Sequence, residues 1–122
     1  MSEKIFLAGV KVDVITGNSI LDKLDSAVKE NSTGTFLYIN AHGVNLSQKH
    51  GWFKQFLNQS TVTYADGQGI RLASWLLGLP IPPLVNLTRW AWELLPYCEK
   101  KKYTIFILGA TETNISRAVE NI

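Results

Sequence analysis

Hydrophobic residues follow two alternating patterns along this chain. Short, nearly continuous apolar runs lie at 34–40, 60–65 and 103–110, and the segments between them carry apolar residues every three or four positions. Continuous runs of this length are typical of strands buried on both faces, and the longer spacing is typical of helices that pack on a core. The order predicts an α/β fold, Rossmann-like, with a mainly parallel sheet flanked by helices.

The pattern also gives bounds for the elements. Residues 5–15 are an extended, β-branched start, and a helix at 19–30 has Asn18 or Ser19 as its cap. Pro96 predicts a kink or an early end in a helix at 88–99, because proline removes a backbone donor. The other predicted elements are strands at 34–40, 60–65 and 103–110, two short helices within 41–58 broken near His50 and Gly51, a helix at 68–77 and a helix capped by Thr111.

Two of these helices have a predicted buried face. The second short helix is expected to turn four side chains to the core: Trp52, Phe53, Phe56 and Leu57. The helix at 68–77 is expected to do the same with Ile70, Ala73, Leu76 and Leu77. The chain stops inside its last helical pattern, and an αβ unit of this kind normally leads into another strand. We therefore expect residues 1–122 to form a single α/β domain, incomplete at its C-terminus, that belongs to the front of a longer protein.

Composition narrows the classes of function. The net charge of +2 is too small to indicate nucleic acid binding. Cys98 is the one cysteine, so neither an internal disulfide nor a cysteine metal site can form, which suits a reducing compartment. No apolar run approaches the roughly 20 residues needed to span a bilayer. The sequence predicts a protein that is soluble or attached to a membrane surface.

Three predicted strands end in residues that could contact a ligand, namely Asn40, Asp66 and Gly109. Ligands of parallel α/β sheets bind beyond the carboxyl ends of the strands. Gly67 and Gly69 allow a ligand to approach the backbone after Asp66, and the following helix offers free N–H groups that attract an anion.

Asp66 has two interpretations. Its carboxylate could act as a base toward a hydroxyl, or it could cap the next helix through a backbone N–H. Asn40 also has two interpretations: its side chain could form a hydrogen bond to its own backbone or to a ligand. Because Leu72 replaces the third glycine of G-x-G-x-x-G, the dinucleotide fingerprint is weak.

Two further groups of residues are weaker candidates for a functional site. His42 and His50 lie apart and lack a paired acidic cluster, so no metal site is expected. The four tryptophans are interpreted as core or interface residues, with sugar platforms as the alternative: Trp52, Trp75, Trp90 and Trp92.

An ordered set of motifs gives the most specific signal. The segments YINAHGVNL, TYADGQGIRLASWLLGLPIPP and YTIFILGATETN, in this order, resemble the WecG/TagA/CpsF glycosyltransferase family from about Phe36 to Ile122. The resemblance implies an inverting transferase that needs no metal or other cofactor. It implies transfer of N-acetylmannosamine or a relative from a UDP-sugar to a polyprenyl-diphosphate-linked sugar, in synthesis of bacterial cell-surface polysaccharide or teichoic acid.

The resemblance also implies roles for residues and a location. Asp66 matches the catalytic base, and the matching substrate-binding positions are Asn40, Gly67, Gln68, Gly69, Thr88, Arg89 and Gly109. The expected location is the cytoplasm, peripheral at the inner face of the cell membrane, with membrane attachment through a C-terminal part that this chain lacks. Nucleic acid is not an expected partner, and homo-oligomerisation stays open.

Four positions depart from the family pattern. Tyr38 stands where many members have threonine, and Leu84, Leu87 and Arg89 replace an arginine, a glycine and an aspartate. Arg89 could pair with a diphosphate or be a surface charge. These departures motivate a second hypothesis, a truncated and inactive module that binds nucleotide-sugar or assembles with another chain. A third, a dinucleotide oxidoreductase, has the incomplete glycine pattern against it.

Overall fold

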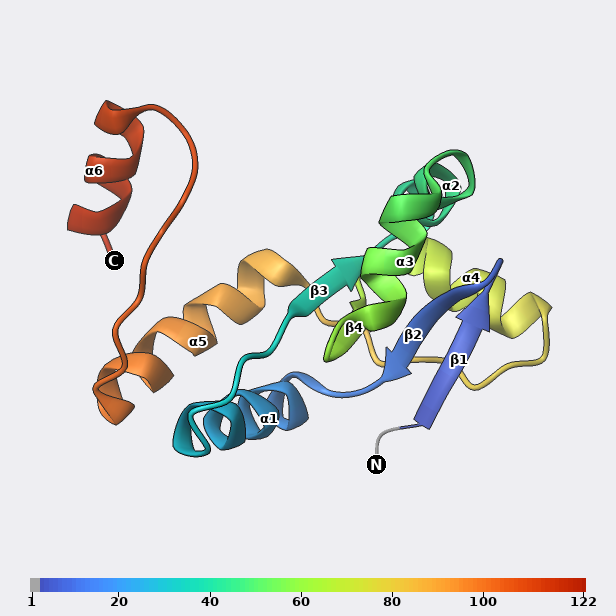
Figure 1. Cartoon of the computed structure of the whole chain (residues 1–122), viewed down its shortest axis with the longest axis horizontal. Coiled ribbons are helices and arrows are strands. Elements are labelled where there is room, and N and C mark those ends of the chain that lie inside the picture. The colour runs from blue at the N-terminus through green and yellow to red at the C-terminus, as the bar shows by residue number, and fades with distance from the viewer. Residues whose placement is uncertain (1–2) are drawn as a thin grey trace. The chain divides into compact units, whose positions relative to one another are not determined.

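The structure, a computed structural model, describes residues 3–122 (Figure 1). The chain forms two compact units, Met1–Leu87 and Thr88–Ile122, which are described separately below. Among the described residues no helix combines the length and the apolar character that a membrane crossing requires. The elements are β1 (Glu3–Leu7), β2 (Val10–Val14), α1 (Gly17–Lys29), β3 (Phe36–Ile39), α2 (Ala41–Lys49), α3 (Gly51–Gln59), β4 (Val62–Ala65), α4 (Gln68–Leu76), α5 (Leu87–Lys101) and α6 (Glu112–Glu120).

A four-stranded sheet in the order β1-β2-β4-β3 forms the centre of the first unit. Strand β4 pairs in parallel with both β2 and β3, whereas β1 pairs antiparallel with β2. The predicted α/β fold with a mainly parallel sheet flanked by helices is confirmed.

The predicted extended start at 5–15 consists of two strands, β1 and β2. Ala8 and Gly9 both have positive φ, 49° and 80°, which matches the tight two-residue turns that join antiparallel strands. Ile5 to Val10 is a nearly continuous apolar run in the sequence, so the hydrophobic pattern alone does not reveal this turn.

Strands and helices of the first unit share one hydrophobic core. Side chains of β3, α3 and α4 meet in it, represented by Ile39, Leu57 and Ile70. Helix α2 lies very close to β3, because a Cβ atom at Gly43 would be 2.6 Å from the Cδ1 atom of Ile39. The buried members of this cluster are Ile5, Leu7, Val10, Val12, Ile39, Leu57, Ala65 and Ile70.

The predicted helices are present, with different caps and faces. Thr16, rather than Asn18 or Ser19, caps α1, since its side chain accepts a hydrogen bond from the Ser19 N–H. The break between α2 and α3 falls at His50, as predicted. In the second unit, α5 continues through Pro96 to Lys101, so of the predicted kink or early end at this proline the early end is wrong.

Two predicted core faces are half correct. In α3, Leu57 is buried and Phe53 packs against the core, but Trp52 and Phe56 are exposed. In α4, Ile70 is buried and Ala73 packs against the core, whereas Leu76 and Leu77 are exposed. A nine-residue helix presents only about two turns to the sheet, so its apolar residues outside that arc remain on the surface.

The predicted strand at 103–110 is not a strand. This segment is extended coil, and its Phe106 and Leu108 side chains are 87% and 89% exposed. An apolar run becomes a strand only when a neighbouring strand completes its backbone hydrogen bonds, and the four-stranded sheet of the described residues does not include this segment. Thr111 caps α6 as predicted, accepting from the Asn114 N–H.

Candidate functional site

Two strand ends lie side by side in the first unit. Ile39 pairs with Ala65 in the register of β3 and β4, so Asn40 and Asp66 each follow the last paired residue of their strands. The Asp66 N–H donates to the Ile39 carbonyl at 2.9 Å. The parallel pairing therefore brings Asn40 and Asp66 to the same edge of the sheet.

The two glycines around Gln68 allow the helices that follow these strands to approach each other. Gly67 has φ of 89°, in the left-handed region that favours glycine, and a Cβ atom there would lie 3.9 Å from the Asn40 Cβ. A Cβ atom at Gly69 would lie only 2.9 Å from the Cβ of Ala41. The N-termini of α2 and α4 are therefore in close contact.

Asn40 caps α2. Its Oδ1 atom accepts a hydrogen bond from the Gly43 N–H at 2.9 Å, as in the interpretation in which it bonds its own backbone. Its Nδ2 group donates no hydrogen bond within residues 3–122. Asn40 can therefore cap the helix with its oxygen and still offer an amide donor to a ligand.

Asp66 does not cap the helix that follows it. Gly67 is the N-cap residue of α4, and the Asp66 carboxylate, which is half-buried, accepts no hydrogen bond from residues 3–122. Gln68, the first residue of α4, is exposed. The Asp66 carboxylate is thus accessible at the rim of the two helix starts, which is the position that a base toward an incoming hydroxyl requires.

Two tyrosines lie next to this carboxylate along the strands. Tyr38 and Tyr64 are register partners on β3 and β4, and each stands two residues before Asn40 or Asp66. Burial raises the pKa of Tyr64 to about 12, and the charges of Asp66 and Tyr38 add to the shift. The phenol of Tyr64 is therefore neutral over the physiological range. Sequence reasoning did not identify Tyr64, although its spacing from Asp66 puts both on one face of the strand.

The remaining predicted binding residues lie in the second unit. Thr88 and Arg89 are exposed in the first turn of α5, and Gly109 is in the exposed coil before α6 with φ of 148°. The structure brings together Asn40, Asp66, Gly67, Gln68 and Gly69, and the site described here consists of these first-unit residues.

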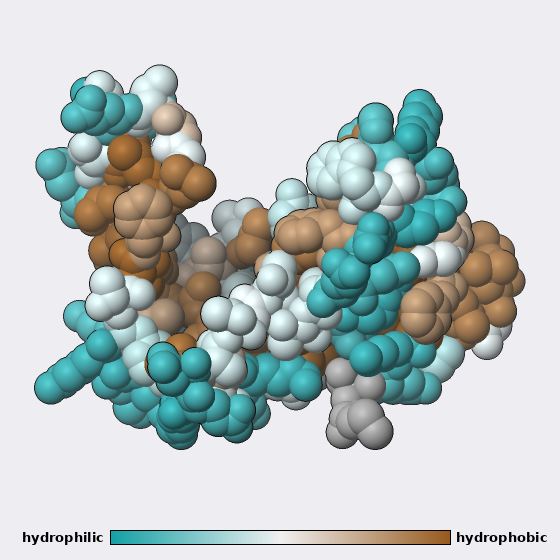
Figure 2. All heavy atoms as spheres, viewed as in Figure 1, coloured by the Kyte–Doolittle hydropathy of each residue, from teal (hydrophilic) through white to brown (hydrophobic). Residues whose placement is uncertain are grey.

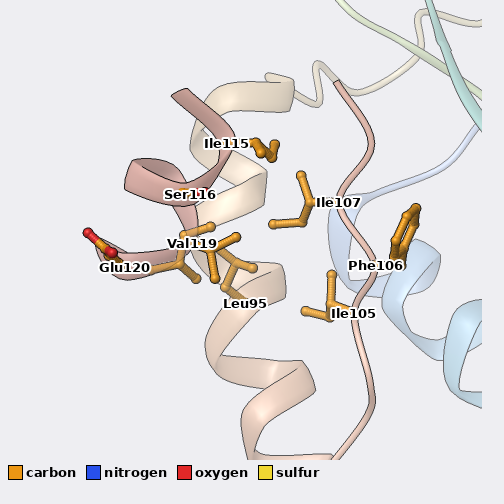
Figure 3. Close-up of a pocket in the computed structure, with 9 residues that line it drawn as sticks. Leu95, Ile105, Phe106, Ile107, Ile115, Ser116, Val119 and Glu120 are labelled. Atoms are coloured by element: carbon orange, nitrogen blue, oxygen red, sulfur yellow. The ribbon is translucent and has the colours of Figure 1, made fainter. Parts of the chain in front are cut away.

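One cavity adjoins this site, and another lies in the second unit. One of about 410 Å³ lies beside β3, α2 and α3, and Tyr38, Asn40 and His42 are among its lining residues. The other, of about 600 Å³, lies in the second unit between α5, the 103–110 segment and α6, and apolar residues such as Leu95, Ile107 and Val119 line most of it (Figure 3). The first cavity combines an apolar wall with polar groups, as ligand sites usually do.

The described residues hold no cluster suited to a metal ion. Within residues 3–122, no three His, Cys, Asp or Glu side chains come together as a possible ligand set. His42 belongs to the first turn of α2, and His50 separates α2 from α3.

Comparison with known proteins gives one family and a group of curated relatives. The model of the glycosyl transferase WecG/TagA/CpsF family matches residues 5–122. The relatives include proteins of Staphylococcus aureus strains NCTC 8325 / PS 47, COL and N315, each named N-acetylglucosaminyldiphosphoundecaprenol N-acetyl-beta-D-mannosaminyltransferase. Each is 25% identical over 117 residues, which cover 94% of this chain and 46% of the relative. The chain thus spans about half the length of the curated relatives it matches.

Proposed function

The chain belongs to the WecG/TagA/CpsF glycosyltransferase family, and we propose that it takes part in an inverting transfer of N-acetylmannosamine or a related sugar from a UDP-sugar to a polyprenyl-diphosphate-linked sugar. The names of the Staphylococcus aureus relatives describe a transfer of this kind. The reaction would serve synthesis of bacterial cell-surface polysaccharide or teichoic acid.

The observation that carries this proposal is the accessible Asp66 carboxylate at the meeting point of two helix starts. Asp66 accepts no hydrogen bond within residues 3–122, so its lone pairs are available to take the proton of an acceptor hydroxyl. The deprotonated oxygen would attack the anomeric carbon of the donor and invert it. A single base is sufficient for this step, so no second carboxylate is required beside Asp66.

The donor diphosphate would lie over the N-termini of α2 and α4. Backbone N–H groups at a helix start attract negative charge, and the contact between Gly69 and Ala41 brings two such starts together. These groups would stabilise the charge that develops on the leaving UDP. The Asn40 amide and the backbone at Gly67 and Gln68 would hold the donor.

No metal or other cofactor enters this proposal, because the proposed steps use only a carboxylate base and backbone donors. The reaction would take place at the cytoplasmic face of the cell membrane, where a polyprenyl-linked acceptor is held. The acceptor and the UDP-sugar are the proposed partners.

A second candidate function is a non-catalytic one, in which the chain binds nucleotide-sugar or assembles with another chain. Its specific support is the 103–110 segment, where Phe106 and Leu108 are almost fully exposed. The replacement of family residues at Leu84, Leu87 and Arg89 also favours it.

Calorimetry with UDP and a turnover assay test the two candidates together. Binding of UDP with transfer to a polyprenyl-diphosphate-linked acceptor supports the transferase. Binding without transfer supports the non-catalytic module, and the absence of binding contradicts both nucleotide-sugar functions.

A further inference from the structure

Strand β3 has an open edge. It is the last strand in the order β1-β2-β4-β3, so on its outer side no strand of residues 3–122 pairs with it. The carbonyls of Thr35 and Ile39 accept hydrogen bonds, at 3.1 and 2.9 Å, from backbone N–H groups at the start of β4 and directly after it. Because the backbone groups of successive strand residues point to alternate edges, Phe36 and Tyr38 turn their N–H and C=O groups to the outer side. This edge can therefore accept one more strand.

A groove runs along the same strand. The cavity of about 410 Å³ beside β3, α2 and α3 has every residue of β3 in its lining. Its wall is mostly apolar, and Leu46, Phe53 and Phe56 contribute to it from the two helices. Tyr38 and Phe56 are each 47% exposed, so apolar side chains that enter the groove would cover them. An added strand would thus find backbone partners on β3 and an apolar seat for one row of its side chains.

The 103–110 segment has the properties of a strand that lacks a neighbour. It is extended coil, and Ile105 to Leu108 form a continuous apolar run. Ile105 and Ile107 line the cavity of the second unit and point toward its helices, whereas Phe106 lies on the opposite side of the segment (Figure 3). Phe106 and Leu108, two positions apart, are almost fully exposed. Figure 2 shows hydrophobic atoms gathered along this part of the second unit. One row of side chains is thus packed and the other is uncovered.

The direction in which this segment would pair follows from what comes after it in the chain. Strands β3 and β4 each lead directly into a helix, α2 after Asn40 and α4 after Gly67. The 103–110 segment leads into α6 in the same way, after Thr111. This order of strand and helix, together with a continuous apolar run, is typical of parallel strands. Parallel pairing with β3 would put the carboxyl end of the segment, at Gly109, on the edge of the sheet that holds Asn40.

We infer that β3 pairs in parallel with the 103–110 segment of a second copy of this chain, and that the exchange is reciprocal. The sheet of the described residues does not include the chain's own segment, so the added strand comes from another molecule. Each copy carries both an open edge and an unpaired segment, so one symmetric contact completes both. Phe106 and Leu108 of one copy enter the groove beside β3 of the other. The association requires neither UDP nor turnover, so it can fail while the proposed transfer holds, and the reverse is also possible.

Sedimentation velocity over a concentration series tests this inference on the full chain. Helix α3 provides a matched pair, because Phe56 lines the groove and Trp52, which is 70% exposed, does not. We expect Phe56→Glu to weaken dimerisation at least about tenfold, and Trp52→Glu to change it by less than about twofold. Phe106→Glu, on the other side of the contact, should also weaken it at least about tenfold.

Mixing two variants tests the reciprocal exchange itself. Phe56→Glu damages the groove and keeps the segment, whereas Phe106→Glu damages the segment and keeps the groove. A mixed dimer therefore has one intact contact, which neither variant can form alone. An equimolar mixture should associate more strongly than either variant by itself.

Circular dichroism of each variant ensures that the comparison is made between folded proteins. If Phe56→Glu unfolds, Tyr38→Pro replaces it, because proline at this position removes an N–H group that points to the open edge and leaves the pairing with β4 intact. Hydrogen exchange gives a second readout. In the dilute, separated chain the amides of 104–109 should exchange rapidly, and protection should appear there as dimers form.

The inference is overturned if the unmodified chain stays monomeric across the concentration series. It is also overturned if Phe56→Glu and Trp52→Glu weaken the dimer equally, or if the mixture of Phe56→Glu and Phe106→Glu associates no better than its components. A further contrary result is protection of 104–109 in a monomer at every concentration, which would mean that the segment pairs within its own chain.

Discussion

Gly69 and Ala41 are in such close contact that a Cβ atom on Gly69 would lie 2.9 Å from the Cβ of Ala41. The two residues belong to the first turns of α4 and α2, so their contact sets the distance between two helix N-termini. A methyl group at position 69 could be separated from the Ala41 methyl group only by a movement of the backbone. The sequence motif of glycines after Asp66 thus has a packing reason in addition to any role in ligand binding.

Gly69→Ala should therefore destabilise the protein, by about 1–3 kcal/mol, because the added methyl group overpacks the contact with Ala41. Gly51→Ala is the matched control, since Gly51 also lies in the first turn of a helix and a Cβ atom there meets nothing within 4 Å. Urea denaturation of the two variants gives the comparison. Equal stability of both would show that α2 and α4 do not approach as described.

Asn40→Ala should cost about 1 kcal/mol of stability, because it removes the cap that accepts from the Gly43 N–H. Asn40→Ser keeps a capping oxygen and should retain most of that stability, yet it lacks the amide donor. If the amide binds the donor substrate, both variants weaken UDP binding in calorimetry while only the alanine variant loses stability. Unchanged UDP affinity in both would limit Asn40 to its structural role.

The tyrosine next to Asp66 predicts a pH effect on stability. The pKa of Tyr64 is raised from 10.0 to about 12 in the folded protein, so between these values the folded state keeps a proton that the unfolded state loses. The free energy of unfolding should therefore fall as pH rises through this window, and Tyr64→Phe should remove part of the fall. Asp66→Asn should lower the Tyr64 midpoint in a spectrophotometric titration, because it removes one negative charge that raises it. A midpoint unaffected by this substitution would place the carboxylate too far from Tyr64.

The backbone of the 103–110 segment should exchange its amide hydrogens rapidly. Residues 104–109 are extended coil outside the sheet, whereas Val62–Ala65 form β4, which has a partner strand on each side. Hydrogen exchange followed by mass spectrometry should show protection in β4 and little in 104–109. Protection of 104–109 comparable to that of β4 would mean that this segment has found a strand partner.

Sequence patterns predicted the first unit well because its signals are local. The short run at β4 is buried as expected, and the break near His50 separates α2 from α3. The predicted burial of the run at β3 on both faces is wrong, because β3 is the edge strand of the sheet and only Ile39 in it is buried. Two failures have a common cause. Burial of an apolar residue depends on whether another segment packs against it. The exposed residues in question are Leu76 and Leu77 at the end of α4 and Phe106 in the 103–110 segment. Hydrophobicity predicts that a residue needs a partner and does not say whether the chain supplies one.

The candidate site was also only partly predictable. The strand-end rule selected Asn40 and Asp66 from the sequence, and the parallel register of β3 and β4 brings them together. Whether Asp66 caps α4 depends on hydrogen-bond geometry that spacing cannot give, and in the structure Gly67 is the cap residue. Sequence reasoning did not identify Tyr64, because a buried tyrosine in a strand has an ordinary structural explanation. The rise in its pKa depends on its burial and on its neighbours Asp66 and Tyr38, which only the structure shows.

The most direct test of the central claim is turnover of a UDP-sugar with a polyprenyl-diphosphate-linked acceptor by Asp66→Asn, measured beside the UDP dissociation constant. Asparagine keeps the shape of the side chain and cannot accept the acceptor proton as a base. The account predicts a loss of turnover of about 10²–10⁴-fold with nearly unchanged UDP affinity. Turnover equal to that of the unmodified protein would contradict the assignment of Asp66 as the base.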